Sequence, residues 1–185
     1  MSGKRIMGRA VSSKRYAQAV FEIAVENDSI EQWTEDLFRL SIAVENLEFI
    51  SLLDAPQIPS SIKTQTIRDV LGDSVDVLSI NLLAVLGARN LTHLLPTIND
   101  EFGRLLDEHH GIARGELISA VPLNDKQIEK TNKILDDLIG RPVRLTASVD
   151  TEIIGGIVGR VGDRVVDGSV RGQLQSMRKT VVDQI

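Results

Sequence analysis

The chain contains no cysteine, which excludes a disulfide framework and any metal site held by thiolates. Aromatic residues make up only 3% of the 185 residues, so few rings are available for stacking on nucleic-acid bases. The formal net charge of -5 gives no general attraction to phosphate backbones. These shortages argue against nucleic-acid binding, while the 42% hydrophobic and 25% charged composition is ordinary for a globular protein.

Long apolar runs are also missing. The longest nearly apolar stretch, Val77 to Ala88, is interrupted by Ser79 and Asn81 and is shorter than the roughly 20 residues that a membrane-spanning helix needs. We therefore expect no direct membrane insertion, and any membrane association has to come through a partner. Residues 1–14 are basic but lack the apolar centre of a secretory signal, so we expect a flexible leader and not a targeting peptide.

Two kinds of pattern divide the rest of the chain. Residues 15–110 show helical periodicity with polar breaks, for example at Asn27-Asp28, where Ser29 and Gln32 predict a capping box for the next helix. The segment contains about six such helices. Residues 111–185 open with a predicted strand over 112–121, a helix over 124–139 and a second strand over 141–149. The sequence thus predicts an α+β fold, with an N-terminal six-helix bundle followed by a small α/β C-terminal domain.

The first and fifth helices of the bundle are too apolar for a single buried face. Between Tyr16 and Val25 the apolar residues sweep about 240° of the helix, at about 100° per residue, and the fifth helix has almost no polar face between Val75 and Ala88. A bundle helix needs an apolar stripe only somewhat over 100° wide. One interpretation makes the fifth helix a fully surrounded central helix. For both helices together, a shared external groove that receives an amphipathic partner helix is the better account.

The last third of the chain contains a glycine-rich run from Val149 to Leu174. Its alternating Val and Ile residues predict two short strands, and Gly162-Asp163-Arg164 predicts the hairpin connection between them. Asp167-Gly168-Ser169 then predicts a turn and the N-cap of a final helix. The apolar side of that helix comprises residues at helical spacing, namely Val170, Leu174, Met177 and Val181.

This run resembles the C-terminal signature of the δ subunits of bacterial ATP synthase, the equivalents of the mitochondrial oligomycin-sensitivity-conferring protein. The matching residues are Ile154-Gly155-Gly156, Gly162-Asp163, Asp167-Gly168-Ser169 and Leu174, and Thr151 stands where the family frequently has proline. Near the other end, Arg15 to Phe21 is similar to the opening of the family's N-terminal helix. The resemblance covers essentially the whole chain.

The resemblance implies a non-catalytic stator subunit, present in one copy per complex and bound peripherally at the cytoplasmic face of the bacterial cell membrane. It would link the catalytic head to the peripheral stalk, so that proton-driven rotation is coupled to ATP synthesis. The bundle over 15–110 would bind the N-terminal helix of an α subunit in a groove lined by Tyr16, Ala19, Val20, Leu82, Val85 and Leu86. The domain over 111–185 would meet the C-terminal helix of a b subunit, with Met177, Val181 and Ile185 as the expected stalk contacts.

Two other classes of function remain as alternatives, a stand-alone helical interaction module and a small nucleotide-binding enzyme. The segment Gly155 to Gly162 is not followed by Gly-Lys-Ser/Thr, and no helix opens directly behind it, so it does not match a phosphate-binding loop. The neighbours His109 and His110 would point about 100° apart on a helix, which argues against a metal site. No nucleophile motif is present. We expect no enzymatic activity and no cofactor.

Overall fold

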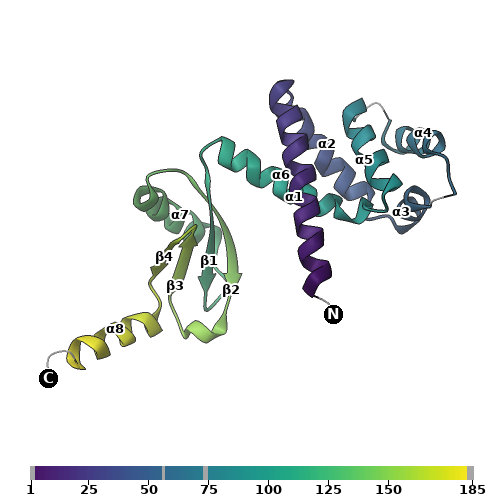
Figure 1. Ribbon diagram of the computed structural model, residues 1–185. Coiled ribbons are helices and arrows are strands. Elements are labelled where there is room, and N and C mark those ends of the chain that lie inside the picture. The colour runs from purple at the N-terminus through teal and green to yellow at the C-terminus, as the bar shows by residue number, and fades with distance from the viewer. Residues whose placement is uncertain (1–2, 56, 73–74, 183–185) are drawn as a thin grey trace. The chain divides into compact units, whose positions relative to one another are not determined.

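The computed structural model describes residues 3–55, 57–72 and 75–182, and side chains for 12–55, 57–59, 61–72 and 75–178. The chain divides into two compact units, Met1–Leu106 and Asp107–Ile185 (Figure 1). The described part of the first unit is helical, and that of the second is a sheet with helices. The predicted α+β fold class is therefore confirmed.

The elements follow the predicted order. The first unit contains α1 (Gly3–Glu26), α2 (Ile30–Ala43), α3 (Leu47–Asp54), α4 (Ser60–Leu71), α5 (Val77–Ala88), the short 3-10 helix η2 (Thr92–Leu94) and α6 (Leu95–His109), whose last turn belongs to the second unit. The second unit continues with β1 (Ala113–Ser119), α7 (Asp125–Ile139), β2 (Val143–Val149), the 3-10 helix η3 (Thr151–Ile153), β3 (Ile157–Val161), β4 (Arg164–Asp167) and α8 (Val170–Val182).

The first helix is longer than its hydrophobic pattern alone indicates. α1 begins at Gly3 and so extends into the segment that the sequence predicted as a leader. This segment contains no proline, the residue least compatible with a helix interior, so the helix can extend through it. The helix ends where predicted, because Asp28 adopts a positive φ of 52°.

The predicted capping box at Ser29 is wrong. The Ser29 side chain makes no cap hydrogen bond, and the amide of Gln32 instead donates to Asp36 Oδ1 at 2.9 Å. Asp36 is completely buried, and its Oδ2 accepts the backbone N–H of Asp76 at 2.9 Å. Because a buried carboxylate is costly unless it is hydrogen-bonded, Gln32 is used to satisfy Asp36, which ties α2 to the start of α5.

One hydrophobic core holds the helices of the first unit together. Leu37, Leu83 and Phe102 lie at its centre with at most 1% of their surface exposed. Phe21 packs edge-on against Phe102, with ring centroids 5.4 Å apart. This cluster runs from Ala17 to Phe102, so every residue in it belongs to the first unit.

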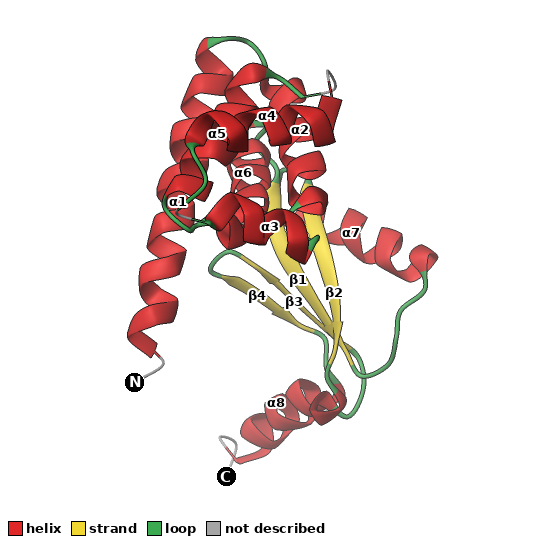
Figure 2. Cartoon of the chain, turned by 90° about the vertical axis from the view of Figure 1, so that its right-hand side faces the viewer, coloured by secondary structure: helices red, strands yellow, loops and turns green. Residues whose placement is uncertain are grey.

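The second unit is built on a four-stranded mixed sheet with the order β2-β1-β3-β4 (Figure 2). β1 and β2 pair in parallel, and α7 is the crossover between them. Leu135 of α7 packs against Ala113, Val143 and Val161 of the sheet. β3 and β4 are antiparallel neighbours joined by Gly162 and Asp163, with Gly162 at a φ of 57°, which confirms the predicted hairpin.

The last turn of α6 is fixed to this sheet by a buried carboxylate. The side chain of Asp107 is only 2% exposed, and it pairs with Arg114 of β1 and, at 2.9 Å, with Arg144 of β2. Arg114 and Arg144 are register partners in neighbouring strands. A buried charge that keeps two charged hydrogen-bond partners is compensated, so this pairing explains why the second unit begins inside α6.

A fragment of residues 1–110 should fold by itself. We expect helical circular dichroism and one cooperative melting transition, because the whole hydrophobic cluster of the first unit lies within this segment. The melting of the full chain serves as the reference. A fragment with random-coil dichroism would contradict the expectation, since it would mean that the bundle needs the sheet in order to fold.

Candidate functional site: two outward apolar helix faces

α5 has two apolar faces, and only one of them is buried. Leu83 and Leu86 have no exposed surface, whereas Val77, Leu78 and Val85 are 54%, 45% and 45% exposed. The interpretation of α5 as a fully surrounded helix is therefore wrong. Its outward face is apolar surface that is available to a partner.

α1 presents a row of its own. Tyr16, Ala19 and Ile23 are spaced by three and four residues, which places them on one side of the helix. Tyr16 is half-buried, Ala19 is exposed and Ile23 is 39% exposed. Val25 is 42% exposed but lies about 180° around the helix from Tyr16 and about 120° from Ala19, which places it outside the row.

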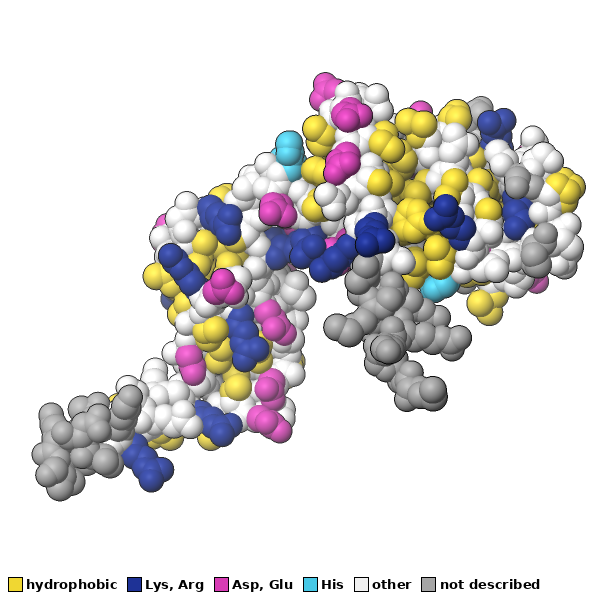
Figure 3. Space-filling model, viewed as in Figure 1, with side chains coloured by type: hydrophobic (Ala, Val, Ile, Leu, Met, Phe, Trp, Pro, Cys, Tyr) yellow, Lys and Arg dark blue, Asp and Glu magenta, His cyan; other side chains and the backbone are white. Residues whose placement is uncertain are grey.

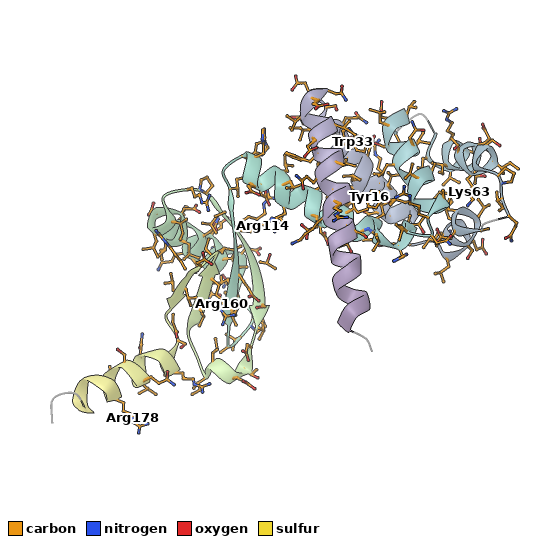
Figure 4. The ribbon with its side chains drawn as sticks, in the orientation of Figure 1. Tyr16, Trp33, Lys63, Arg114, Arg160 and Arg178 are labelled. Atoms are coloured by element: carbon orange, nitrogen blue, oxygen red, sulfur yellow. The ribbon has the colours of Figure 1, made fainter. Side chains whose placement is uncertain are left out.

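One hydrogen bond links the two helices at this surface. Arg89, directly after α5, donates from Nη1 to the Tyr16 hydroxyl at 3.1 Å, and Tyr16 is labelled on α1 in Figure 4. Figure 3 shows hydrophobic side chains gathered over α1 and α5 on this face. We call this region the α1/α5 surface and define it by Tyr16, Ala19 and Ile23 of α1 and by Leu78, Leu82 and Val85 of α5.

Four of the six residues predicted for the groove lie on the α1/α5 surface, namely Tyr16, Ala19, Leu82 and Val85. The other two do not reach it. Val20 is 3% exposed and Leu86 is fully buried, and both belong to the core of the bundle. The reason is that one residue along a helix turns a side chain by about 100°, which takes Val20 and Leu86 from the outer row into the core.

Ile23 and Leu78 are members of the surface that the sequence analysis did not select. Ile23 follows Ala19 by four residues, and Leu78 precedes Leu82 by four. Both belong to rows with alternating steps of three and four, the spacing by which one helix packs along another. That spacing was the signal in the sequence that could have identified them.

α8 carries the second outward apolar face. Val170, Leu174 and Met177 are spaced by four and three residues and are 42%, 58% and 65% exposed. We call these three residues the α8 stripe. Figures 1 and 2 show α8 leaving the end of the sheet, with its axis directed away from the strands. The stripe is apolar surface that is available to a partner.

The expected stalk contacts fall partly within the described residues. Met177 lies on the α8 stripe. Val181 belongs to α8, but its side chain is outside the described set, and Ile185 lies outside the described residues altogether. Of the three, Met177 is therefore the one whose exposure supports the expectation.

The glycine-rich segment forms part of the sheet. Its strand β3 pairs with β1 on one side and β4 on the other, so its backbone donors serve the sheet. Among the described residues, no three His, Cys, Asp or Glu side chains lie close enough together to hold a metal ion. In the same part of the chain, no helix has the length and apolar character needed to cross a membrane.

Known proteins are similar to this chain over nearly its whole length. Residues 13–181 match the family model described as the ATP synthase delta (OSCP) subunit. The chain is 31% identical to ATP synthase subunit delta of Chlorobaculum parvum over 177 residues, which cover 95% of this chain and 98% of that protein. It is 35% identical to ATP synthase subunit delta of Alcanivorax borkumensis over 165 residues, covering 89% and 93% of the two chains.

A solved structure shares the fold. A chain from the cryo-EM structure of the Toxoplasma gondii mitochondrial ATP synthase hexamer superimposes with a TM-score of 0.61 and 21% identity. The match covers 92% of this chain and 97% of that chain. At this level of identity the likeness concerns the fold alone.

The assignment of outer and inner residues on α5 predicts opposite results for two neighbouring substitutions. Val85→Asp should change the free energy of unfolding by less than about 1 kcal/mol, because Val85 is 45% exposed. Leu86→Asp should lower it by several kcal/mol or prevent folding, because it places an unpaired carboxylate in the core. Urea denaturation of both variants measures the difference, and equal losses of stability would refute the assignment.

Proposed function

Because the chain belongs to the ATP synthase delta (OSCP) family, we propose that its bundle binds the N-terminal helix of an α subunit and that its sheet unit binds the C-terminal helix of a b subunit. The chain is a stator subunit of F-type ATP synthase and is not itself an enzyme. Family membership also removes the two alternatives, a stand-alone interaction module and a nucleotide-binding enzyme.

The observation that carries the first contact is the α1/α5 surface. Two apolar rows with steps of three and four residues match the way an amphipathic helix lies along a hydrophobic surface, with anchors at intervals of three, four and seven. Full burial of a Val or Leu side chain contributes about 1.5–3 kcal/mol, so each half-exposed residue contributes roughly half of that. Several such residues suffice to bind a helix after the cost of association is subtracted.

Small side chains matter at this surface as much as large ones. Ala19 lies between Tyr16 and Ile23 in the α1 row. A methyl group at this position lets the axis of a partner helix approach closely, and larger neighbours on both sides fill the space beside it. The surface therefore fits a helix with its own apolar row, which is the chemistry that we assign to the N-terminal segment of the α subunit.

The α8 stripe supports the second contact. A helix whose described side chains from Gln173 to Arg178 are all exposed offers its apolar side to another helix. We assign the helix of the b subunit to this side, with Met177 as a contact residue. With the bundle on the head and the sheet unit on the stalk, one copy of the chain holds the head against the torque of the rotating central stalk. We therefore assign it a peripheral position at the cytoplasmic face of the cell membrane.

Binding of a synthetic peptide with the sequence of the N-terminal helix of the α subunit tests the first contact. Tyr16→Asp or Val85→Asp should weaken the affinity about a hundredfold or more, because burying an unpaired carboxylate costs several kcal/mol. Val25→Asp is the matched control, since Val25 is an equally exposed valine on the opposite side of α1. Isothermal titration calorimetry measures the peptide affinity of the unsubstituted chain and of the three variants. The same affinity for Val85→Asp as for Val25→Asp would contradict the assignment.

Omitting the chain from reconstituted membranes tests the stator role in the complex. ATP hydrolysis by the head should persist, because no catalytic group is lost, whereas ATP-driven proton pumping should disappear, because the head is no longer held against rotation. Adding back the purified chain should restore pumping. Proton pumping that continues at full rate without the chain would refute the stator role.

A further inference from the structure

The end of the sheet and the start of α8 are joined by two turns that are hydrogen-bonded to each other. The backbone N–H of Gly168 donates to the carbonyl of Ile157, and the N–H of Val170 donates to the carbonyl of Gly155, both at 2.9 Å. The turns are residues 154–157, which enter β3, and residues 167–170, which leave β4 and begin α8. We call these two segments together the clasp.

The first turn of α8 is held from inside the clasp. Asp167 Oδ1 accepts the backbone N–H of Ser169 at 2.8 Å, and the Ser169 hydroxyl accepts the N–H of Gly172 at 3.0 Å. Ser169 is only 4% exposed. The hydrogen bonds from the Ser169 side chain and backbone lower the pKa of Asp167. The carboxylate and the hydroxyl therefore satisfy N–H groups that a helix start otherwise leaves unpaired.

The two turns approach so closely that glycine is required between them. Gly156 has a φ of 88°, and a Cβ atom there would lie 2.4 Å from the carbonyl oxygen of Gly168 and 2.8 Å from Cα of Ser169. Both are backbone atoms and cannot rotate away. A Cβ on Gly172 would likewise lie 2.7 Å from Asp167 Oδ2. At Gly156 the two turns are therefore in contact backbone on backbone.

The clasp also contains a strained residue. Ile154 has a φ of 65° and a ψ of -47°, and the N–H of Gly155 donates to the carbonyl of Ile153 across it at 2.7 Å. This is a γ-turn of the rare hand, and a β-branched residue is strongly disfavoured in it. Such strain persists only where the surroundings hold it, and it marks a turn whose geometry matters.

Beyond the clasp, the described side chains of α8 are not buried against the sheet unit. Every described side chain from Gln173 to Arg178 is exposed, and the α8 stripe itself is about half exposed. We propose that the clasp is a positioning element, which sets the direction in which α8 leaves the sheet and so aims the α8 stripe at the stalk helix. The stalk helix is the one assigned in the proposed function, so this inference rests on that assignment.

A pair of glycine variants separates positioning from plain stability. Gly156→Ala disturbs the clasp, whereas Gly162→Ala imposes a positive φ on alanine in the β3–β4 turn, where a Cβ would meet no atom within 4 Å. Both variants strain the same sheet unit, but only the first touches the start of α8. Gly162→Ala is therefore the matched control for backbone strain without displacement of α8.

The direction of α8 can be measured without any partner. The chain has no cysteine, so Thr146→Cys on β2 and Gln175→Cys on α8, both exposed positions, accept a pair of spin labels at unique sites. Double electron–electron resonance of the full-length chain measures the distance between the two spin labels. It should give one narrow distance distribution with the native clasp and with Gly162→Ala. Gly156→Ala should broaden or shift it.

Binding of a synthetic peptide with the sequence of the C-terminal helix of the b subunit gives the functional result. If Gly156→Ala leaves only about a tenth of the molecules with α8 in the competent direction, the apparent affinity falls about tenfold. Gly162→Ala should bind like the unsubstituted chain. An unchanged distance distribution together with unchanged affinity for Gly156→Ala would overturn the inference.

Two further results keep the inference separate from folding and from the proposed function. If Gly156→Ala fails to fold, Ser169→Ala removes the hydrogen bonds of the Ser169 hydroxyl without a clash. Ser119→Ala, a serine that is 1% exposed and bonded to the Val121 carbonyl, is its control. Equal distance distributions for these two serine variants would overturn the inference. If the unsubstituted chain fails to bind the peptide while Gly156→Ala alone alters the distances, the stalk assignment is wrong and the positioning of α8 stands.

Discussion

The structure depends on one constraint: each of the two units exposes an apolar helix face that is left for another molecule to cover. α5 has leucine and valine on both faces, and the bundle buries only the face that contains Leu83 and Leu86. α8 repeats the situation at the other end of the chain, where the stripe through Leu174 and Met177 is exposed. Such exposed apolar faces lower the solubility of a protein, and they are tolerated when another molecule covers them. Each unit is thus incomplete on one side, as a connector between two larger bodies has to be.

The periodicity of the sequence predicted which segments are helices and strands, because most segments alternate clearly between apolar and polar residues. The strand predicted over 112–121 is β1, and the hairpin at Gly162 and Asp163 forms as expected. The capping box at Ser29 did not form, because Gln32 is used by the buried carboxylate of Asp36. That competition comes from a contact with Asp76, 40 residues away along the chain, and a local motif carries no information about it.

The candidate site was predictable as a surface but not residue by residue. In a helix that is apolar on nearly every side, the pattern of polar and apolar residues does not mark the buried side. The sequence of α5 therefore does not say which of Val85 and Leu86 faces outward. On α1, Gln18 and Glu22 mark the polar side, but the edge between the outer row and the core is not marked, so Val20 was placed in the groove although it is buried. In the glycine-rich run the turns were predicted from residue type. The close approach of Gly156 to Gly168 was not, because it depends on two segments that meet only in the fold.

The hydrogen bond from Arg89 to Tyr16 has a consequence for how a helix sits on the α1/α5 surface. The other five members of this surface are aliphatic, and hydrophobic contact has no preferred direction, so a helix could slide along them through many registers of similar energy. The phenol oxygen, held by the guanidinium, makes one end of the surface polar and so different from the other end. A bound helix must place a polar group or its own end there, and this requirement selects one binding register among the many that the aliphatic residues would allow.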